Sequence, residues 1–220
     1  MRRGINFIQK CSMASATQYE PKPLPFKKSL TGISDKAMAI HHDKLYVGYV
    51  TKMKEIAARF KELLEKPEVF AAANQSYSEL RALRDGETFA TNGVYLHEYY
   101  FNVLGGGGVP MGALVDAIAE KWGSFEKFAM SFSATGMAVR GWVVLAWDTH
   151  IGRLKIYGAD AHNQGGVWGA IPIIVLDVYE HAYFMDYGSD RKKYIEDFWK
   201  NLNWAAANMV YARARGITRE

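Results

Sequence analysis

The chain has 220 residues, 49% hydrophobic and 23% charged, which is enough to bury a core as one domain or two small ones. Its net charge of +4 comes from scattered basic residues, not from the dense basic stripe of a nucleic-acid-binding protein. The longest uncharged apolar run, residues 167–176, is far shorter than the roughly 20 residues of a membrane-spanning helix. We therefore expect neither nucleic acid nor membrane as a partner, and the single cysteine, Cys11, indicates a reducing, cytoplasmic compartment.

The chain should begin with a leader followed by a long helix. Residues 1–21 are basic at their start and carry no A-x-A cleavage site, so we predict a disordered leader and not a targeting peptide. Ser34 and Asp35 are typical N-caps for a helical pattern that continues to about Lys66. Pro67 should end that helix.

Two more helices should complete an N-terminal helical hairpin domain over residues 22–104. One is predicted over about residues 69–84, ending at a turn at Asp85-Gly86. The next is apolar or aromatic nearly all round, which indicates burial on most sides, and it stops at the four glycines 105–108. A glycine run can also bind phosphate, but this one lacks the preceding strand and the following Lys-Ser/Thr of a phosphate loop. We interpret it as a domain boundary.

Residues 105–220 should form a C-terminal α/β domain. A helix is expected near residues 112–122, a short one after Ser124 and a last one after Asp190. Between them the β-branched and aromatic runs predict strands over residues 141–148, 153–160 and 171–178. The fold class is therefore α+β, a helical hairpin followed by a three-stranded antiparallel sheet surrounded by helices.

Polar residues in apolar surroundings point to a metal site. Most histidines in folded proteins are ordinary polar groups, but His41 and His97 fall within apolar or aromatic helix faces. Asp177 and His181 follow a buried strand, where an unpaired carboxylate would be costly. Three imidazoles and one carboxylate suit iron, manganese or zinc, and the ligand types alone do not choose among them.

At these residues the sequence resembles the iron/manganese superoxide dismutase family. Asp177-Val-Tyr-Glu-His181-Ala-Tyr183 matches the family's D-x-W-E-H-A-Y, with Tyr179 in place of the usual Trp. His41-His-Asp-Lys44, ahead of Tyr49, and the segment from His97 to Asn102 match around the first two ligands. The resemblance extends from about Pro23 to Tyr211 and implies dismutation of superoxide to dioxygen and hydrogen peroxide.

The resemblance also implies a cofactor, a ligand set and partners. The ligands are His41, His97, Asp177 and His181, and they hold one iron or manganese ion per subunit, with iron slightly favoured. Tyr49 matches the tyrosine at the substrate funnel. Glu180 and His181 match a pair that joins two subunits, so we expect a homodimer or tetramer through these residues and Tyr183.

One catalytic group differs in origin among family members, namely the side chain that faces the metal's solvent ligand. Gly93, one turn before His97, offers no side chain there. His162 has the spacing to Asp177 of members that use histidine, whereas Gln164, the manganese-type residue, comes two positions later. We therefore predict that His162 has this role.

Departures from the family pattern leave two other functions open. Leu45 and Tyr46 replace the two histidines that usually follow the family's lysine, and a leucine neither donates nor accepts a hydrogen bond. The alternative is a metal-binding homologue with little dismutase activity, favoured by Leu45. A zinc-dependent hydrolase on the same ligands is a third hypothesis, against which no carboxylate stands out as a general base.

Overall fold

The computed structural model describes residues 19–217, so all but the last three residues of the predicted leader lie outside the described part. The elements in chain order are α1 (Asp35–Ile40), η2 (His41–Tyr46), α2 (Val47–Leu63), α3 (Pro67–Ala71), α4 (Glu79–Asn102), α5 (Ala113–Trp122), α6 (Phe125–Ala138), β1 (Trp142–Asp148), β2 (Arg153–Ala159), β3 (Ala170–Asp177), α7 (Glu180–Tyr187), α8 (Arg191–Asn201) and α9 (Trp204–Arg215). This order, helices first and then a sheet with helices, confirms the predicted α+β class. No helix within the described residues is both long and apolar enough to cross a membrane.

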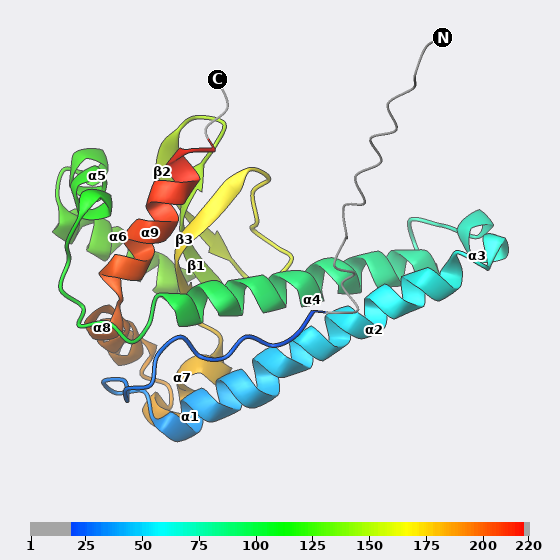
Figure 1. The fold of residues 1–220 in the computed structure, drawn as a ribbon, viewed down its shortest axis with the longest axis horizontal. Coiled ribbons are helices and arrows are strands. Elements are labelled where there is room, and N and C mark those ends of the chain that lie inside the picture. Colours follow the sequence, from blue (N-terminus) through cyan, green and yellow to red (C-terminus); the bar gives the residue numbers. More distant parts are fainter. Residues whose placement is uncertain (1–18, 218–220) are drawn as a thin grey trace, which may run out of the picture.

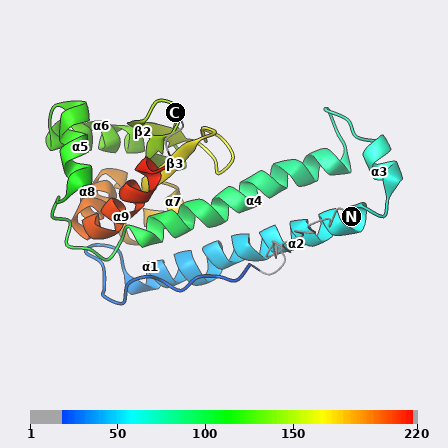
Figure 2. The same cartoon turned by 45° about the horizontal axis from the view of Figure 1, so that its top comes forward.

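The N-terminal part is a long helical hairpin. Helices α2 and α4 pack along each other and extend away from the sheet, with α3 at the tip (Figure 1, Figure 2). As predicted, Ser34 caps the first helix, its hydroxyl accepting a hydrogen bond from the Ala37 amide at 3.1 Å. The helix from α1 to α2 continues through η2, a π-helical segment, which was not predicted.

The second and third predicted helices were wrong in their boundaries. The segment over residues 69–84 is not one helix, because α3 ends at Ala71 and α4 begins only at Glu79. Ser78 is the N-cap of α4, accepting a hydrogen bond from the Arg81 amide at 3.2 Å. Asp85-Gly86 makes no turn, because Gly86 lies inside α4 where a methyl group would already be 3.4 Å from the Ile56 side chain of α2. That distance is an ordinary van der Waals contact, so this position lies in the packed interface of the two helices.

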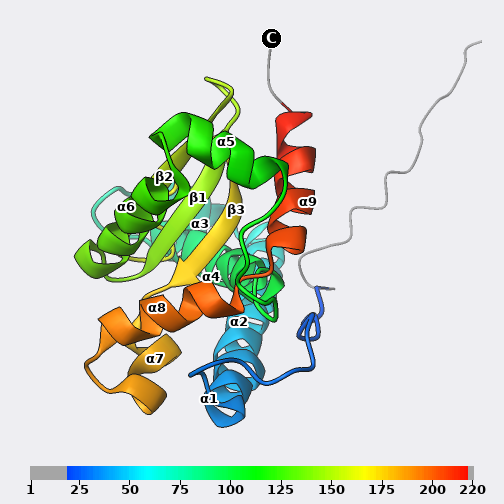
Figure 3. The same ribbon diagram turned by 90° about the vertical axis from the view of Figure 1, so that its left-hand side faces the viewer.

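The C-terminal part is built around an antiparallel sheet of order β2-β1-β3. All three strands were predicted, and Pro172 fits in β3 because that strand lies at the edge of the sheet. Helices α5 and α6 lie against the β2 and β1 side and α9 lies alongside β3 (Figure 3). Helices α7 and α9 were not predicted, and α6 is longer than the short helix expected.

Two of the four glycines, Gly106 and Gly108, pack closely against the end of α8 and the start of α9. The Gly106 amide donates to the Asn201 carbonyl at 2.9 Å, and the Gly108 amide donates to the Leu202 carbonyl at 3.1 Å. A Cβ on Gly106 would lie 2.2 Å from the Leu202 carbonyl oxygen, so only glycine fits. The segment therefore fastens the hairpin to the C-terminal helices, and its role as a domain boundary stays a prediction.

The sheet register brings the two parts together. Trp142, the first residue of β1, pairs with Asp177, the last residue of β3, so both lie at the same end of the sheet's strands. Helix α4 packs against β3, and the core is continuous from the hairpin to the sheet. Polar side chains of α4 and β3 consequently meet in a fully buried region.

Candidate metal centre

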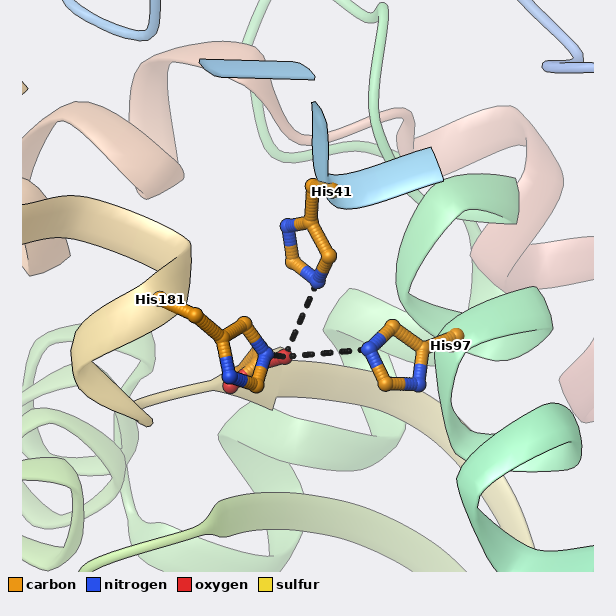
Figure 4. A group of neighbouring side chains, drawn as sticks. His41, His97 and His181 are labelled. Atoms are coloured by element: carbon orange, nitrogen blue, oxygen red, sulfur yellow. Dashed lines mark hydrogen bonds and ion pairs between the residues drawn. The ribbon is translucent and has the colours of Figure 1, made fainter. Parts of the chain in front are cut away.

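Four residues from four elements converge at this junction. His41 opens η2, His97 is on α4, Asp177 ends β3 and His181 is in the first turn of α7. One ligand atom from each lies within 4.8 Å of the others, and Figure 4 shows the three imidazole rings pointing toward a common centre. His41, His97 and Asp177 are buried, and His181 is partly exposed. The structure thus brings together all four residues predicted to be ligands.

The geometry leaves nitrogen lone pairs without partners. Asp177 Oδ2 lies 3.2 Å from His41 Nε2, 3.7 Å from His97 Nε2 and 3.0 Å from His181 Nε2. Among the described residues, the Nε2 atoms of His41 and His97 are buried without any hydrogen-bond partner. Buried polar atoms of this kind cost free energy unless a cation or hydrogen bond satisfies them. A metal ion bound by these four atoms would satisfy them all.

The protonation states suit metal binding. His97 Nδ1 lies 2.5 Å from the Gly93 carbonyl, which can only accept, so Nδ1 carries the proton and Nε2 presents its lone pair to the centre. Burial lowers the pKa of both His41 and His97, which keeps these rings neutral. Burial alone would raise the pKa of Asp177, but the neighbouring imidazoles, first His181 and then His41, hold it well below its usual range. Asp177 is therefore an ionised carboxylate, and His41 and His97 are neutral imidazoles.

His181 differs from the other ligands because its pKa is raised. Burial would lower it, but the neighbouring Asp177 carboxylate outweighs burial. Without metal, His181 Nε2 and Asp177 Oδ2 form a hydrogen bond, and a metal ion would have to displace that proton.

A hydrogen-bonded chain flanks the centre. The indole Nε1 of Trp142 donates to His162 Nδ1 at 2.9 Å, so Nδ1 is the acceptor and the ring proton of the neutral His162 is on Nε2. Burial lowers the pKa of His162 to about 4, which keeps it neutral. Its Nε2 lies 2.7 Å from the Tyr49 hydroxyl, and the Tyr49 ring centroid is 5.4 Å from that of His97. Because Nε2–H donates to the Tyr49 oxygen, the Tyr49 proton is free to point elsewhere.

The other predicted positions are arranged differently. Gln164 is exposed and pairs with Ala161 in an isolated bridge, whereas His162 is buried. Leu45 is half-buried on η2. A methyl group on Gly93 would lie 2.8 Å from the Tyr49 ring, so the absence of a side chain there is required by the position of Tyr49.

Sequence reasoning missed two features of this region. Trp142 lies at the start of the first predicted strand, and no sequence signal shows that its indole fixes the tautomer of His162. Tyr46 is fully buried and donates to the Glu98 carboxylate at 2.8 Å, which ties η2 to α4 beside His97. An indole or phenol in an apolar run signals a required partner, but the sequence does not reveal which partner.

Comparisons with known proteins identify the family to which this chain is similar. A family model described as iron/manganese superoxide dismutases, C-terminal domain, matches residues 110–210. An iron superoxide dismutase of Aquifex pyrophilus is 42% identical over 200 residues, covering 89% of this chain and 92% of the relative. One of Cupriavidus metallidurans is 37% identical over 200 residues, covering 89% and 98%. A manganese superoxide dismutase of Halobacterium salinarum is 33% identical over 192 residues, covering 86% and 92%.

Proposed function

The chain belongs to the iron/manganese superoxide dismutase family, and on this basis we propose that His41, His97, Asp177 and His181 hold its iron or manganese ion. The protein is a superoxide dismutase, which converts superoxide to dioxygen and hydrogen peroxide. The observation that carries the ligand assignment is the pair of buried Nε2 atoms without partners around a buried carboxylate. The alternative of an idle metal-binding homologue is not favoured, because the relatives that match over most of the chain are dismutases.

A bound iron or manganese ion supplies one-electron chemistry, oxidation of one superoxide and reduction of the next. The second half of the reaction also consumes two protons to make hydrogen peroxide. We assign proton delivery to Tyr49 and His162. With His162 Nε2–H donating to the Tyr49 oxygen at 2.7 Å, the Tyr49 hydroxyl proton remains available for the reduced substrate.

Trp142 supports this assignment as a positioning residue. If its indole did not occupy His162 Nδ1, the neutral ring could carry its proton on either nitrogen, and the hydrogen bond to Tyr49 would lose its fixed direction. Trp142 is fully buried, so this arrangement does not compete with solvent.

For the metal, we favour iron over manganese. The two relatives at 42% and 41% identity are named as iron enzymes, while manganese enzymes match at 33%. Metal-free protein reloaded separately with iron, manganese or zinc, then assayed for superoxide consumption, tests both proposals. We expect activity with iron, less with manganese and none with zinc. Activity with zinc alone would remove the redox assignment.

We propose a homodimer or tetramer formed through Glu180, His181 and Tyr183. Glu180 is exposed beside the partly exposed His181, and among the described residues the Nδ1 of His181 has no hydrogen-bond partner. Phe184 and Met185, 57% and 49% exposed, extend an apolar surface along α7. A Glu180→Ala variant should dissociate in light scattering, and an unchanged assembly would contradict this interface.

The lone Cys11 supports a cytoplasmic antioxidant enzyme.

A further inference from the structure

Three tyrosines form a continuous path from the metal centre to the surface, and we call Tyr100, Tyr194 and Tyr187 the tyrosine ladder. The Tyr100 ring lies 5.3 Å from the His41 ring, centroid to centroid. The hydroxyl oxygens of Tyr100 and Tyr194 are 3.1 Å apart, and the rings of Tyr194 and Tyr187 are 5.7 Å apart. Tyr100 and Tyr194 are fully buried, whereas Tyr187 is partly exposed.

The hydrogen bonds along the ladder have a defined direction. Tyr194 donates to the Asp177 carbonyl at 2.7 Å, so in the bond between the two phenols Tyr100 is the donor. At the outer end, Tyr187 donates to Asp197 Oδ2 at 3.1 Å. Each phenol thus donates one hydrogen bond, and only at the outer end, at Tyr187, is the acceptor a carboxylate. Proton delivery through Tyr49 uses none of these residues.

A second route out of Tyr194 is less favourable. Tyr183 stacks on Tyr194 at 5.4 Å, but the Arg191 Nε donates to its hydroxyl at 3.1 Å and the guanidinium lies 5.5 Å from its ring centroid. A positive charge so close opposes removal of an electron. Tyr183 is also buried, whereas Tyr187 is partly exposed, so the ladder should reach the surface at Tyr187.

We propose that the tyrosine ladder carries oxidising equivalents from the metal centre to the surface. It does so when hydrogen peroxide, the product of dismutation, reacts at the metal centre. One hydrogen peroxide would take two electrons and two protons from two tyrosine phenols and become two waters, leaving two tyrosyl radicals. A thiol in solution returns an electron and a proton at Tyr187. This inference rests on the proposed metal site, and it gives the enzyme a peroxidase-type side reaction that protects the aromatic residues around the ligands.

The test is the position of the radical in iron-loaded enzyme treated with hydrogen peroxide. A nitroso spin trap marks surface tyrosyl radicals, and peptide mass spectrometry locates the adduct. Tyr157 is the matched internal control, since it is half-buried and donates to Asp148 Oδ2 at 2.9 Å but has no ring contact with the ladder among the described residues. We expect adducts on Tyr187 and not on Tyr157. Equal labelling of both would show radicals arriving from solvent and would overturn the proposal.

Two variants separate the ladder from general damage. Tyr194→Phe keeps a ring but removes the phenol. This should lower labelling of Tyr187 about tenfold, which corresponds to a rise of about 1.4 kcal/mol in the barrier to transfer. Tyr187→Phe leaves the centre untouched, so the tyrosyl signal in electron paramagnetic resonance should persist longer because the radical is held inside. Unchanged labelling in Tyr194→Phe, or an unchanged signal lifetime in Tyr187→Phe, would refute the ladder.

Superoxide consumption by the same wild-type preparation is measured separately. A preparation that consumes superoxide yet gives no Tyr187 adduct refutes the ladder and leaves the metal site standing. Failure to bind iron would refute the metal site itself.

Discussion

Replacing Gly93 with alanine should damage activity far more than stability. A Cβ at this position would lie 2.8 Å from Tyr49 Cδ1 and 2.9 Å from Cγ. Since Cγ is the root of a rigid ring and not the end of a flexible chain, the whole Tyr49 side chain must move away from Gly93. That movement changes the 2.7 Å contact of the Tyr49 hydroxyl with His162.

The two effects of Gly93→Ala on stability partly cancel. Alanine in a helix interior is favoured over glycine by about 1 kcal/mol, while overpacking a buried site costs about 1–3 kcal/mol. The free energy of unfolding should therefore fall by at most about 2 kcal/mol. Displacement of a catalytic group by about 1 Å, however, can lower a rate by roughly 100-fold.

Gly48→Ala is the matched control, because Gly48 is an exposed helical glycine next to Tyr49 whose added methyl group meets nothing within 4 Å. It should stabilise the protein by about 1 kcal/mol with unchanged activity. Urea unfolding of metal-loaded protein and superoxide consumption per bound metal give the two readouts. Full activity in Gly93→Ala would refute the claim that Tyr49 is held in one functional position.

Further predictions concern the same chain of groups. Tyr49→Phe should slow the proton-consuming half-reaction in pulse radiolysis, most clearly above neutral pH, and a rate equal to wild type at pH 8 would show another proton route. His162→Ala should shift the metal's redox potential and lower activity far more than Gln164→Ala, and the reverse ranking would contradict the role of His162. In metal-free protein the lowered pKa values of His162, His41 and His97 mean that unfolding takes up protons below their unfolded pKa of about 6.5. Urea midpoints should therefore fall as pH drops from about 6.5 towards 4. The raised pKa of His181 opposes this fall. A midpoint that rises on acidification would contradict the buried, neutral rings.

Several elements were predictable because one local signal decided them. Ser34 caps the first helix, Pro67 begins α3, and the three strands carry continuous apolar or β-branched runs. In α4, by contrast, Gly86 resembled a turn residue but lies inside a helix that packs along α2. Tertiary contact overrode local propensity at that position.

At the candidate site, too, the sequence predicted some features and not others. The resemblance identified the four ligands, and the apolar context of His97 and Asp177 already indicated that their polar groups need a partner. The tautomer of His162 could not be predicted, since it depends on Trp142, which is brought near His162 only when β1 pairs with β2 and Trp142 lies opposite Ala159. The π-helical segment at His41 likewise has no recognised sequence signal.

The most direct test of the account is metal content and superoxide consumption measured on one preparation each of wild-type protein and the His97→Ala variant. His97 is fully buried with its Nε2 unpartnered, so its removal leaves three ligands and a cavity that water can enter. We predict one iron ion per chain and activity proportional to iron in the wild type, and neither in the variant. Stoichiometric iron with full activity in His97→Ala would contradict the metal centre described above.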